Sequence, residues 1–139
     1  MARVVLSVLL VVLAGAIAPP SRADAAAGEL SRAQVRIACR SVPAGAARWA
    51  HAVNRYWGRW LARYQHRRLT VSELRRALLI IWRESNGQPR VVNRLSGCAG
   101  LFQLLPAYGR GRYNLLQPQT NISLAGMLYV RRGWAPWAL

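Results

Sequence analysis

The sequence lacks lysine altogether and is poor in acidic residues. Among its 139 residues there are 20 basic residues, all arginine, against only four Asp or Glu, and the formal net charge is +16. A chain with this balance is attracted to polyanions. The shortage of acids also restricts the chemistry, because after residue 25 the only carboxylate side chains are Glu29, Glu73 and Glu84.

Metal-binding side chains are also scarce. The two histidines, His51 and His66, are 15 residues apart, and no Cys or carboxylate stands at ligand spacing from either of them. Metal sites need several such ligands close together. The sequence therefore predicts no metal site, and we expect no other cofactor.

There is no apolar run long enough to cross a membrane. The longest run covers residues 4–17, follows Arg3, and precedes Pro19-Pro20 and the small residues Ala23-Asp24-Ala25. A membrane-spanning helix needs about 20 apolar residues, and a short run followed by small residues is typical of a secretory signal peptide. We predict a signal peptide over residues 1–25 and export to the periplasm or the medium. Cleavage after residue 18 and an uncleaved anchor are the alternatives.

Loss of residues 1–25 would remove Arg3, Arg22 and Asp24 and leave 114 residues with a formal charge of +15. That length suits one small domain with a single core. In an exported protein the available polyanions are the cell wall and lipid head groups, so we expect association with an anionic wall or membrane surface and no specific nucleic acid. We expect a monomer.

Cysteine is limited to Cys39 and Cys98. Two cysteines in an oxidising compartment usually pair, so export predicts a disulfide between them. Two free buried thiols are the alternative.

The clearest helix signal covers residues 70–85 and places Glu84 at the C-terminal end. Thr70 and Glu73 form a capping box, and Asn86-Gly87 before Pro89 is the expected stop. At the helical period, Glu84 borders a stripe formed by the apolar residues Leu74, Ala77, Leu78 and Ile81.

A carboxyl group beside the core and at the negative end of a helix dipole tends to keep its proton, so we expect a raised pKa and a role as general acid for Glu84. The alternative is a partly exposed Glu84 paired with one of the many arginines, which would lower its pKa.

Three motifs in order resemble the soluble lytic transglycosylase family, which is related to goose-type lysozymes. Residues 84–89 (ESNGQP) are similar to its E-S-x-G-x-P stretch at the catalytic Glu, and residues 97–104 (GCAGLFQL) to its G-x-x-G-L-(M/F)-Q-(L/I) stretch. Residues 118–129 resemble its D-P-x-x-N-I-x-x-G-x-x-Y helix from the proline onward. The resemblance covers residues 70–130 and implies that Glu84 is catalytic.

The resemblance also implies an all-α, lysozyme-like domain of about five helices. The helical periods place these over residues 29–40, 48–68, 70–85, 101–105 and 120–132, with 26–69 as an N-terminal helical region and 70–139 as the catalytic core of one domain.

The helix at residues 48–68 has an apolar stripe that includes Trp57, Trp60 and Tyr64, and arginines on another face. This pattern indicates either contact with an anionic membrane or glycan, or core aromatics beneath a solvated basic face.

Carried over position by position, the resemblance implies substrate-binding residues in the loop and helix that follow Glu84. These are Ser85, Ser96, Gly100, Leu101, Gln103, Asn121, Tyr129 and Trp134. The sequence departs from many members of the family because it ends without an A-Y-N-A-G motif, whose tyrosine supports the catalytic Glu. A compact subgroup with G-L-F-Q and a G-W-x-P-W ending is more similar. Tyr129, Tyr113 and Tyr108, in that order, are the candidates to assist Glu84.

The spacing of the acids bears on the mechanism. A two-carboxylate glycosidase needs its acids about 5 to 9.5 Å apart, but Glu73 is about 16 Å from Glu84 along the helix at 1.5 Å per residue. Glu29 stays open as a partner. The resemblance implies that one Glu acts on peptidoglycan as acid and then as base, and leaves a 1,6-anhydromuramoyl product. The alternatives are a hydrolytic lysozyme on the same fold and a non-enzymatic, cationic wall- or membrane-binding protein with antimicrobial action.

Overall fold

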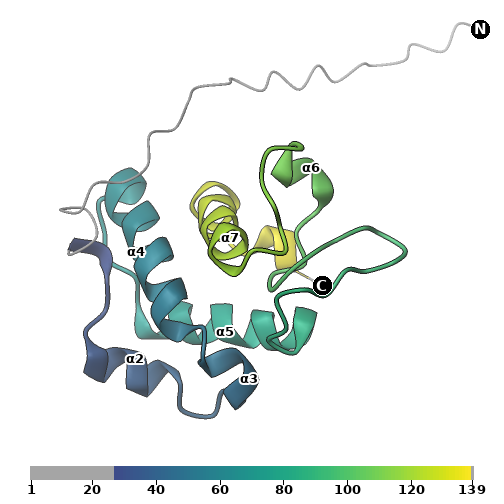
Figure 1. The fold of residues 1–139 in the computed structure, drawn as a ribbon. Coiled ribbons are helices and arrows are strands. Elements are labelled where there is room, and N and C mark those ends of the chain that lie inside the picture. Colours follow the sequence, from purple (N-terminus) through teal and green to yellow (C-terminus); the bar gives the residue numbers. More distant parts are fainter. Residues whose placement is uncertain (1–26, 139) are drawn as a thin grey trace, which may run out of the picture.

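The computed structural model describes residues 27–138, which form an all-α arrangement. In order along the chain the helices are α2 (Arg32–Ala38), α3 (Ala44–Ala47), α4 (Ala50–Gln65), α5 (Val71–Ser85), α6 (Pro106–Gly109), α7 (Pro118–Arg132) and the 3-10 helix η1 (Ala135–Trp137). Figure 1 shows α4, α5 and α7 around a common centre, with α2 and α3 below and the segment between α5 and α7 at the right. The predicted all-α class is confirmed. The predicted signal peptide lies outside the described residues.

Helix α5 begins and ends as the sequence predicts. The Thr70 hydroxyl accepts from the Glu73 backbone N–H at 3.2 Å while the Glu73 carboxylate accepts from the Thr70 N–H at 2.8 Å. At the other end Asn86 is left-handed, with φ of 51°, and Gly87 follows at 77°. The predicted apolar stripe is buried, since Leu74, Ala77, Leu78 and Ile81 are all 0% exposed. The helix therefore holds its last turn, and Glu84 with it, in a fixed place.

The indole of Trp57 on α4 forms the centre of the core. It is 0% exposed, stacks on Phe102 and Tyr129 at centroid distances of 5.5 and 4.9 Å, and donates a hydrogen bond to the Ile122 carbonyl at 3.1 Å. Gly126 lets α7 approach this indole, because a Cβ there would lie 2.8 Å from the Trp57 ring. Aromatic packing thus joins α4 to α7, which is the most extensive helix pair.

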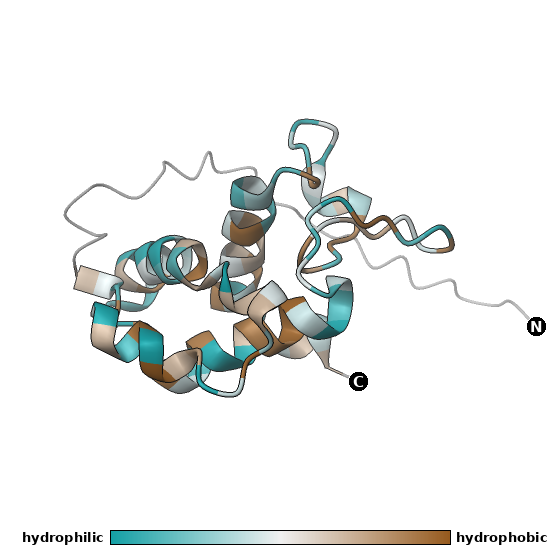
Figure 2. Cartoon of the chain, turned by 60° about the horizontal axis from the view of Figure 1, so that its bottom comes forward, coloured by the Kyte–Doolittle hydropathy of each residue, from teal (hydrophilic) through white to brown (hydrophobic). Residues whose placement is uncertain are grey.

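The N-terminal segment packs on α4 through backbone contacts. Asn54, only 4% exposed, accepts from the Leu30 N–H at 2.8 Å and donates to the Leu30 carbonyl at 3.1 Å. Gly28 and Gly58 lie so close that a Cβ on Gly28 would fall 1.9 Å from the Gly58 carbonyl oxygen. One cluster of buried side chains therefore includes both the N-terminal helices and α5 to α7. Figure 2 shows hydrophobic and hydrophilic residues on different sides of the long helices, as this packing requires.

Two predicted elements differ from the structure. The predicted helix over 101–105 is wrong: residues 101–103 are turns, Ala99 and Leu104 exchange two backbone hydrogen bonds of 3.0 Å, and Gln103 has a φ of 46°. The short helix begins at Pro106 instead, because proline suits a first helical turn but not a helix interior. The predicted helix over 29–40 is shorter, since Ser31 and Gln34 form a capping box that sets its first turn at Arg32.

The predicted disulfide between Cys39 and Cys98 is also corrected, because both are free cysteines. Cys39 ends α2, which packs on α4 and α5 at the lower left of Figure 1. Cys98 lies in the loop after α5, where its carbonyl accepts from the Asn93 N–H at 2.8 Å. The two thiols are thus held by different parts of the fold. Burial raises the pKa of the Cys39 thiol, which suits an inert side chain.

Candidate active site

Glu84 lies in the last turn of α5 and is fixed there by its neighbours. The Ser85 hydroxyl is within 3.0 Å of both the Ile81 and the Leu101 carbonyl oxygens, so it ties the helix end to the following loop. The Gly87 carbonyl accepts from Arg48 at 2.7 Å and from the Trp49 indole at 2.9 Å. The backbone that carries Glu84 is therefore held from two sides, which limits the positions its carboxylate can take.

The side chain of Glu84 is 26% exposed, and its carboxylate pairs with the adjacent Arg83. Arg83 donates from Nε and Nη2 to Glu84 Oε1 at 2.9 and 2.6 Å, and from Nη2 to the Trp137 carbonyl at 2.8 Å. The second carboxylate oxygen, Oε2, takes no part in these bonds. The structure therefore bears out the ion pair of the alternative interpretation, and Arg83 is a site residue that the sequence reasoning missed. Its only signal was its place next to Glu84.

The loop beside Glu84 is built around the buried side chain of Asn121. This amide is 0% exposed, donates to the Ala99 and Leu115 carbonyls at 2.9 Å each, and accepts from the Phe102 N–H at 2.9 Å. Gly100, with a φ of 78°, passes so close that a Cβ would lie 2.3 Å from Asn121 Nδ2. The amide thus satisfies the Phe102 N–H and the Leu115 carbonyl. The Ala99 carbonyl also accepts from the Leu104 N–H.

Gln103 and Trp137 hold the same loop from its other sides. The Gln103 amide donates to the Val91 and Gly100 carbonyls at 3.1 and 3.0 Å, and the Trp137 indole donates to the Phe102 carbonyl at 3.0 Å. Antiparallel bridges of Val92 to Ala99 and of Ala99 to Leu104 complete it. The loop that follows the candidate acid is therefore rigid, although none of its residues is in a helix.

A cavity of about 480 Å³ opens next to this loop, between the segment after α5 and the segment before α7. Its lining consists of Pro89, Arg90, Asn114, Leu116, Gln117 and Pro118. Glu84 does not line it. Its volume is within the usual range for ligand pockets, about 300 to 1,000 Å³.

A comparison with models of protein families identifies the family of this chain. Residues 65–132 match the family model of the Transglycosylase SLT domain. The chain carries an SLT domain. A search of curated proteins and a search of solved structures found no match. The SLT domain runs from the end of α4 to the end of α7 and includes Glu84, the loop after α5 and Asn121.

The SLT family consists of glycan-cleaving, transglycosylase-type enzymes that act on the peptidoglycan of the cell wall. That substrate indicates a periplasmic or extracellular place of action. Within residues 27–138 no helix is long and apolar enough to cross a membrane, and no three His, Cys, Asp or Glu side chains are grouped to hold a metal ion.

The predicted substrate-binding residues of the SLT domain fall into two groups. Ser85, Gly100, Leu101, Asn121 and Tyr129 are buried, so in this structure they support the loop and the core. Ser96 is exposed, and Gln103 and Trp134 are partly exposed, so these three are the predicted residues that a ligand can reach.

None of the three candidate tyrosines is bonded to Glu84 in the described part of the SLT domain. The Tyr129 hydroxyl donates to Glu73 Oε1 at 2.5 Å, and the Tyr108 hydroxyl accepts from Arg132 at 3.3 Å. Tyr113 is 55% exposed. The expectation that Tyr129 assists Glu84 fails on geometry, because its hydroxyl lies at the opposite end of α5.

Proposed function

We propose that the protein is a lytic transglycosylase that cleaves the β-1,4 bond between N-acetylmuramic acid and N-acetylglucosamine. Glu84 first donates a proton to the oxygen of the breaking bond, while the substrate's 2-acetamido oxygen attacks the sugar C1. The Glu84 carboxylate then takes the proton of the C6 hydroxyl, whose oxygen closes the 1,6-anhydro ring at C1. The bond between the acetamido oxygen and C1 breaks as this ring closes, so the 2-acetamido group is regenerated and no water is consumed.

The observation that carries this proposal is the isolation of Glu84 from the other acids. Burial alone would raise the pKa of Glu73, but hydrogen bonds from Arg67, Tyr129 and Thr70 outweigh it and lower that pKa to about 2. Glu73 is thus ionised and paired with Arg67. It lies about 16 Å from Glu84 along α5, at 1.5 Å per residue. A mechanism that uses one carboxylate and the substrate's own acetamido group fits this arrangement.

Glu29, which the sequence left open, also stands apart from Glu84. It lies in the N-terminal segment, where its backbone carbonyl accepts from Arg68 at 2.7 Å and its neighbour Leu30 is bonded to Asn54 on α4. Arg68 lies in the short connection between α4 and α5, so Glu29 lies toward the end of α5 that is remote from Glu84. This supports Glu84 as the only acid of the site among the described residues.

Arg83 holds Oε1 of Glu84, so the transferred proton is carried on Oε2 or Arg83 first releases Oε1. The Arg83 side chain is 41% exposed, so it has room to turn toward solvent or toward an anionic group of the substrate. The bond from Arg83 to the Trp137 carbonyl offers a place where the guanidinium stays anchored while Glu84 is released.

The test is the Glu84→Gln protein with Glu29→Gln as its charge-matched control. The amide cannot transfer the proton, so release of soluble fragments from peptidoglycan should fall by about 10² to 10⁴ or more, while Glu29→Gln keeps its activity. Mass spectrometry should find wild-type products that end in the anhydro sugar, one water lighter than hydrolysed ends.

Each other outcome has a definite meaning. Products with reducing ends only would assign the protein as a hydrolytic lysozyme. A fully active Glu84→Gln protein would refute the catalytic assignment. Wall binding by a wild-type protein that releases no fragments would favour the non-enzymatic, cationic wall-binding protein.

A further inference from the structure

A second cavity, remote from Glu84, lies between α4 and α7. It has a volume of about 340 Å³ and is lined by Trp60, Tyr64, Met127, Val130 and Arg131. Its volume falls within the range of ligand pockets. Trp60 and Tyr64 precede residue 65, so two of the five lining residues come from outside the stretch that matches the SLT family.

The two aromatic rings of this cavity stack on each other and form the Trp60–Tyr64 platform. Trp60 and Tyr64 are four residues apart on α4 and stack at a centroid distance of 5.5 Å with 23° between their planes. Tyr64 is 42% exposed, so part of its side chain remains accessible to a ligand. The helical stripe of residues 48–68 thus divides: Val53, Trp57 and Leu61 are core, whereas Trp60 and Tyr64 are only partly covered.

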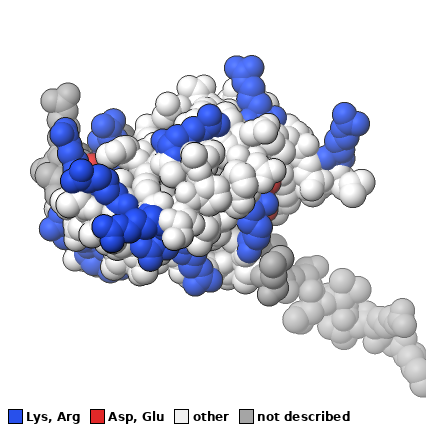
Figure 3. Space-filling model, turned by 90° about the horizontal axis from the view of Figure 1, so that it is seen from below, with Lys and Arg blue, Asp and Glu red and all other residues white. Residues whose placement is uncertain are grey.

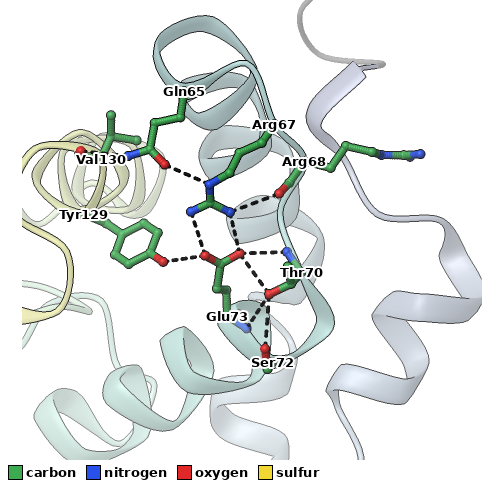
Figure 4. Close-up of polar contacts among 8 residues, drawn as sticks. All are labelled: Gln65, Arg67, Arg68, Thr70, Ser72, Glu73, Tyr129 and Val130. Atoms are coloured by element: carbon green, nitrogen blue, oxygen red, sulfur yellow. Dashed lines mark hydrogen bonds and ion pairs between the residues drawn. The ribbon is translucent and has the colours of Figure 1, made fainter.

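The platform is held in place by its own contacts. The Trp60 indole donates to the Ser123 hydroxyl at 3.2 Å, and the Arg63 guanidinium lies 5.6 Å from the centroid of the Tyr64 ring. The Gln65 amide donates to the Val130 carbonyl at 3.0 Å and fastens the end of α4 to α7, as Figure 4 shows. A rigid aromatic surface suits a rigid ring better than a flexible acyl chain, because little side-chain freedom is lost on binding.

The platform indicates a ligand with a ring, and the basic residues around it indicate that this ligand also carries an anionic group. Arg131 lines the cavity and is exposed, and Arg63 stands beside Tyr64. Guanidinium groups form short, paired hydrogen bonds with carboxylates. A polymer of pyranose rings with carboxylate-bearing substituents matches both features, since the C–H face of a sugar ring packs on aromatic rings.

We propose that the Trp60–Tyr64 platform is a second glycan-binding site, which holds one pyranose ring of the peptidoglycan strand and one of its carboxylates against Arg131. The identity of the polymer rests on the proposed function. The site does not contact the reacting atoms: Val130 follows Tyr129, whose hydroxyl is bonded to Glu73 at the opposite end of α5 from Glu84. It would keep the enzyme on the polymer while Glu84 acts elsewhere.

Sedimentation with insoluble peptidoglycan tests this site, with Glu84→Gln in every protein so that the polymer stays intact. Adding Tyr64→Ala should weaken binding about fivefold, the equivalent of one aromatic contact. Tyr64→Phe keeps the ring and should bind like its parent. Leu79→Ala is the matched control, because Leu79 is 43% exposed and lies on α5, outside the cavity. Arg131→Gln should weaken binding more than Arg132→Gln, which removes the same charge one residue away.

Equal binding of the Tyr64→Ala and parent proteins would overturn the proposal, and so would an equal loss in Leu79→Ala. A Tyr64→Ala protein that binds peptidoglycan normally but loses affinity for anionic phospholipid vesicles would assign the cavity to a lipid surface instead. Fragments released by the Glu84→Gln parent would count against the catalytic role of Glu84 and not against the platform, so the two proposals fail separately.

Discussion

At the scale of single residues, two polar side chains of the matching motifs differ in exposure and in hydrogen bonding. The sequence marks Asn121 and Glu84 alike as site residues. Asn121 is 0% exposed and bonded at all three positions it offers to the loop, whereas Glu84 keeps a quarter of its side chain exposed and one oxygen outside the Arg83 pair. Burial and hydrogen bonding therefore separate the residue that shapes the loop from the residue that can do chemistry.

Asn121→Ala should destabilise the protein by about 2 to 5 kcal/mol, because the buried Phe102 N–H and Leu115 carbonyl lose their partners and the Ala99 carbonyl loses one of two. Chemical denaturation measures this loss. Asn114→Ala is the control, because Asn114 is exposed and its side chain accepts one bond, from the Leu116 N–H at 3.0 Å. The change should cost less than about 1 kcal/mol. Wild-type stability of Asn121→Ala together with a raised KM would show instead that this amide binds substrate.

At the scale of elements, the N-terminal turn of α5 is joined to α4 and α7 by one polar network (Figure 4). Glu73 accepts two hydrogen bonds from Arg67, of 2.8 and 3.1 Å, and one from Tyr129, while it also caps the helix through Thr70. Arg67 in turn donates to the Gln65 side chain at 2.8 Å. The Glu73 carboxylate on α5 thus bonds directly to α7 and to the connection between α4 and α5, and its ionised form accepts these bonds best.

Glu73→Gln should therefore lower stability near neutral pH by about 1 to 3 kcal/mol. The pKa of Glu73 is lowered from 4.5 to about 2, so its contribution is complete above pH 4.5 and is lost as the pH falls toward 2. Unfolding free energies of wild type and variant, measured from pH 7 down to pH 2, should converge over that window. A difference that does not change with pH would exclude this role of the ionised carboxylate.

The C-terminal end of α5 depends on a close approach to α3. Gly87 has a φ of 77°, and a Cβ there would lie 2.0 Å from the Gly45 carbonyl oxygen. Gly133 also has a positive φ, of 57°, but nothing lies within 4 Å of its Cβ position. Gly133→Ala should destabilise by about 1 to 3 kcal/mol from conformation alone. Gly87→Ala should destabilise by more than this, because the clash with the Gly45 carbonyl adds to the conformational cost. Thermal melting of the two variants separates contact from backbone strain, and equal shifts would contradict the close packing.

At the scale of the whole molecule, arginines cover much of the surface. Figure 3 shows basic side chains spread over the face seen from below, with little acidic surface between them. Glu73 and Glu84, two of the three acids in the described chain, are each paired with an arginine. The remaining charge is available to a polyanion such as the wall.

Binding to insoluble peptidoglycan should weaken steeply as salt is added, because exposed charges are screened within about 8 Å at physiological ionic strength. The measurement uses the Glu84→Gln protein at low and high salt, so that cleavage does not remove the polymer. A neutral glycan without carboxylates is the control, since its binding should change little with salt. If binding to the wall is the same at both concentrations, stacking and hydrogen bonds hold the protein and the charge does not.

Prediction from the sequence was most successful where the signals are local. The capping box of Thr70 with Glu73 and the left-handed Asn86 each depend on residues within one turn, and both are confirmed. The predicted helix over 101–105 failed because its residues are held by distant groups, chiefly Asn121 and Ser85. The disulfide failed for a similar reason, since a compartment predicts whether cysteines can pair but not whether the fold brings them together.

By itself the sequence determined the helical class, the bounds of α5, the place of Glu84 at its end and the family motifs around it. These follow from hydrophobic periodicity, capping and the spacing of a few residues, all of which operate over short stretches of chain. Only the tertiary structure decided that Arg83 pairs with Glu84, that Tyr129 donates to Glu73, and that Trp60 and Tyr64 are only partly covered. Those outcomes depend on which surfaces meet when α4, α5 and α7 pack, and contacts between residues far apart in the chain have no local signal.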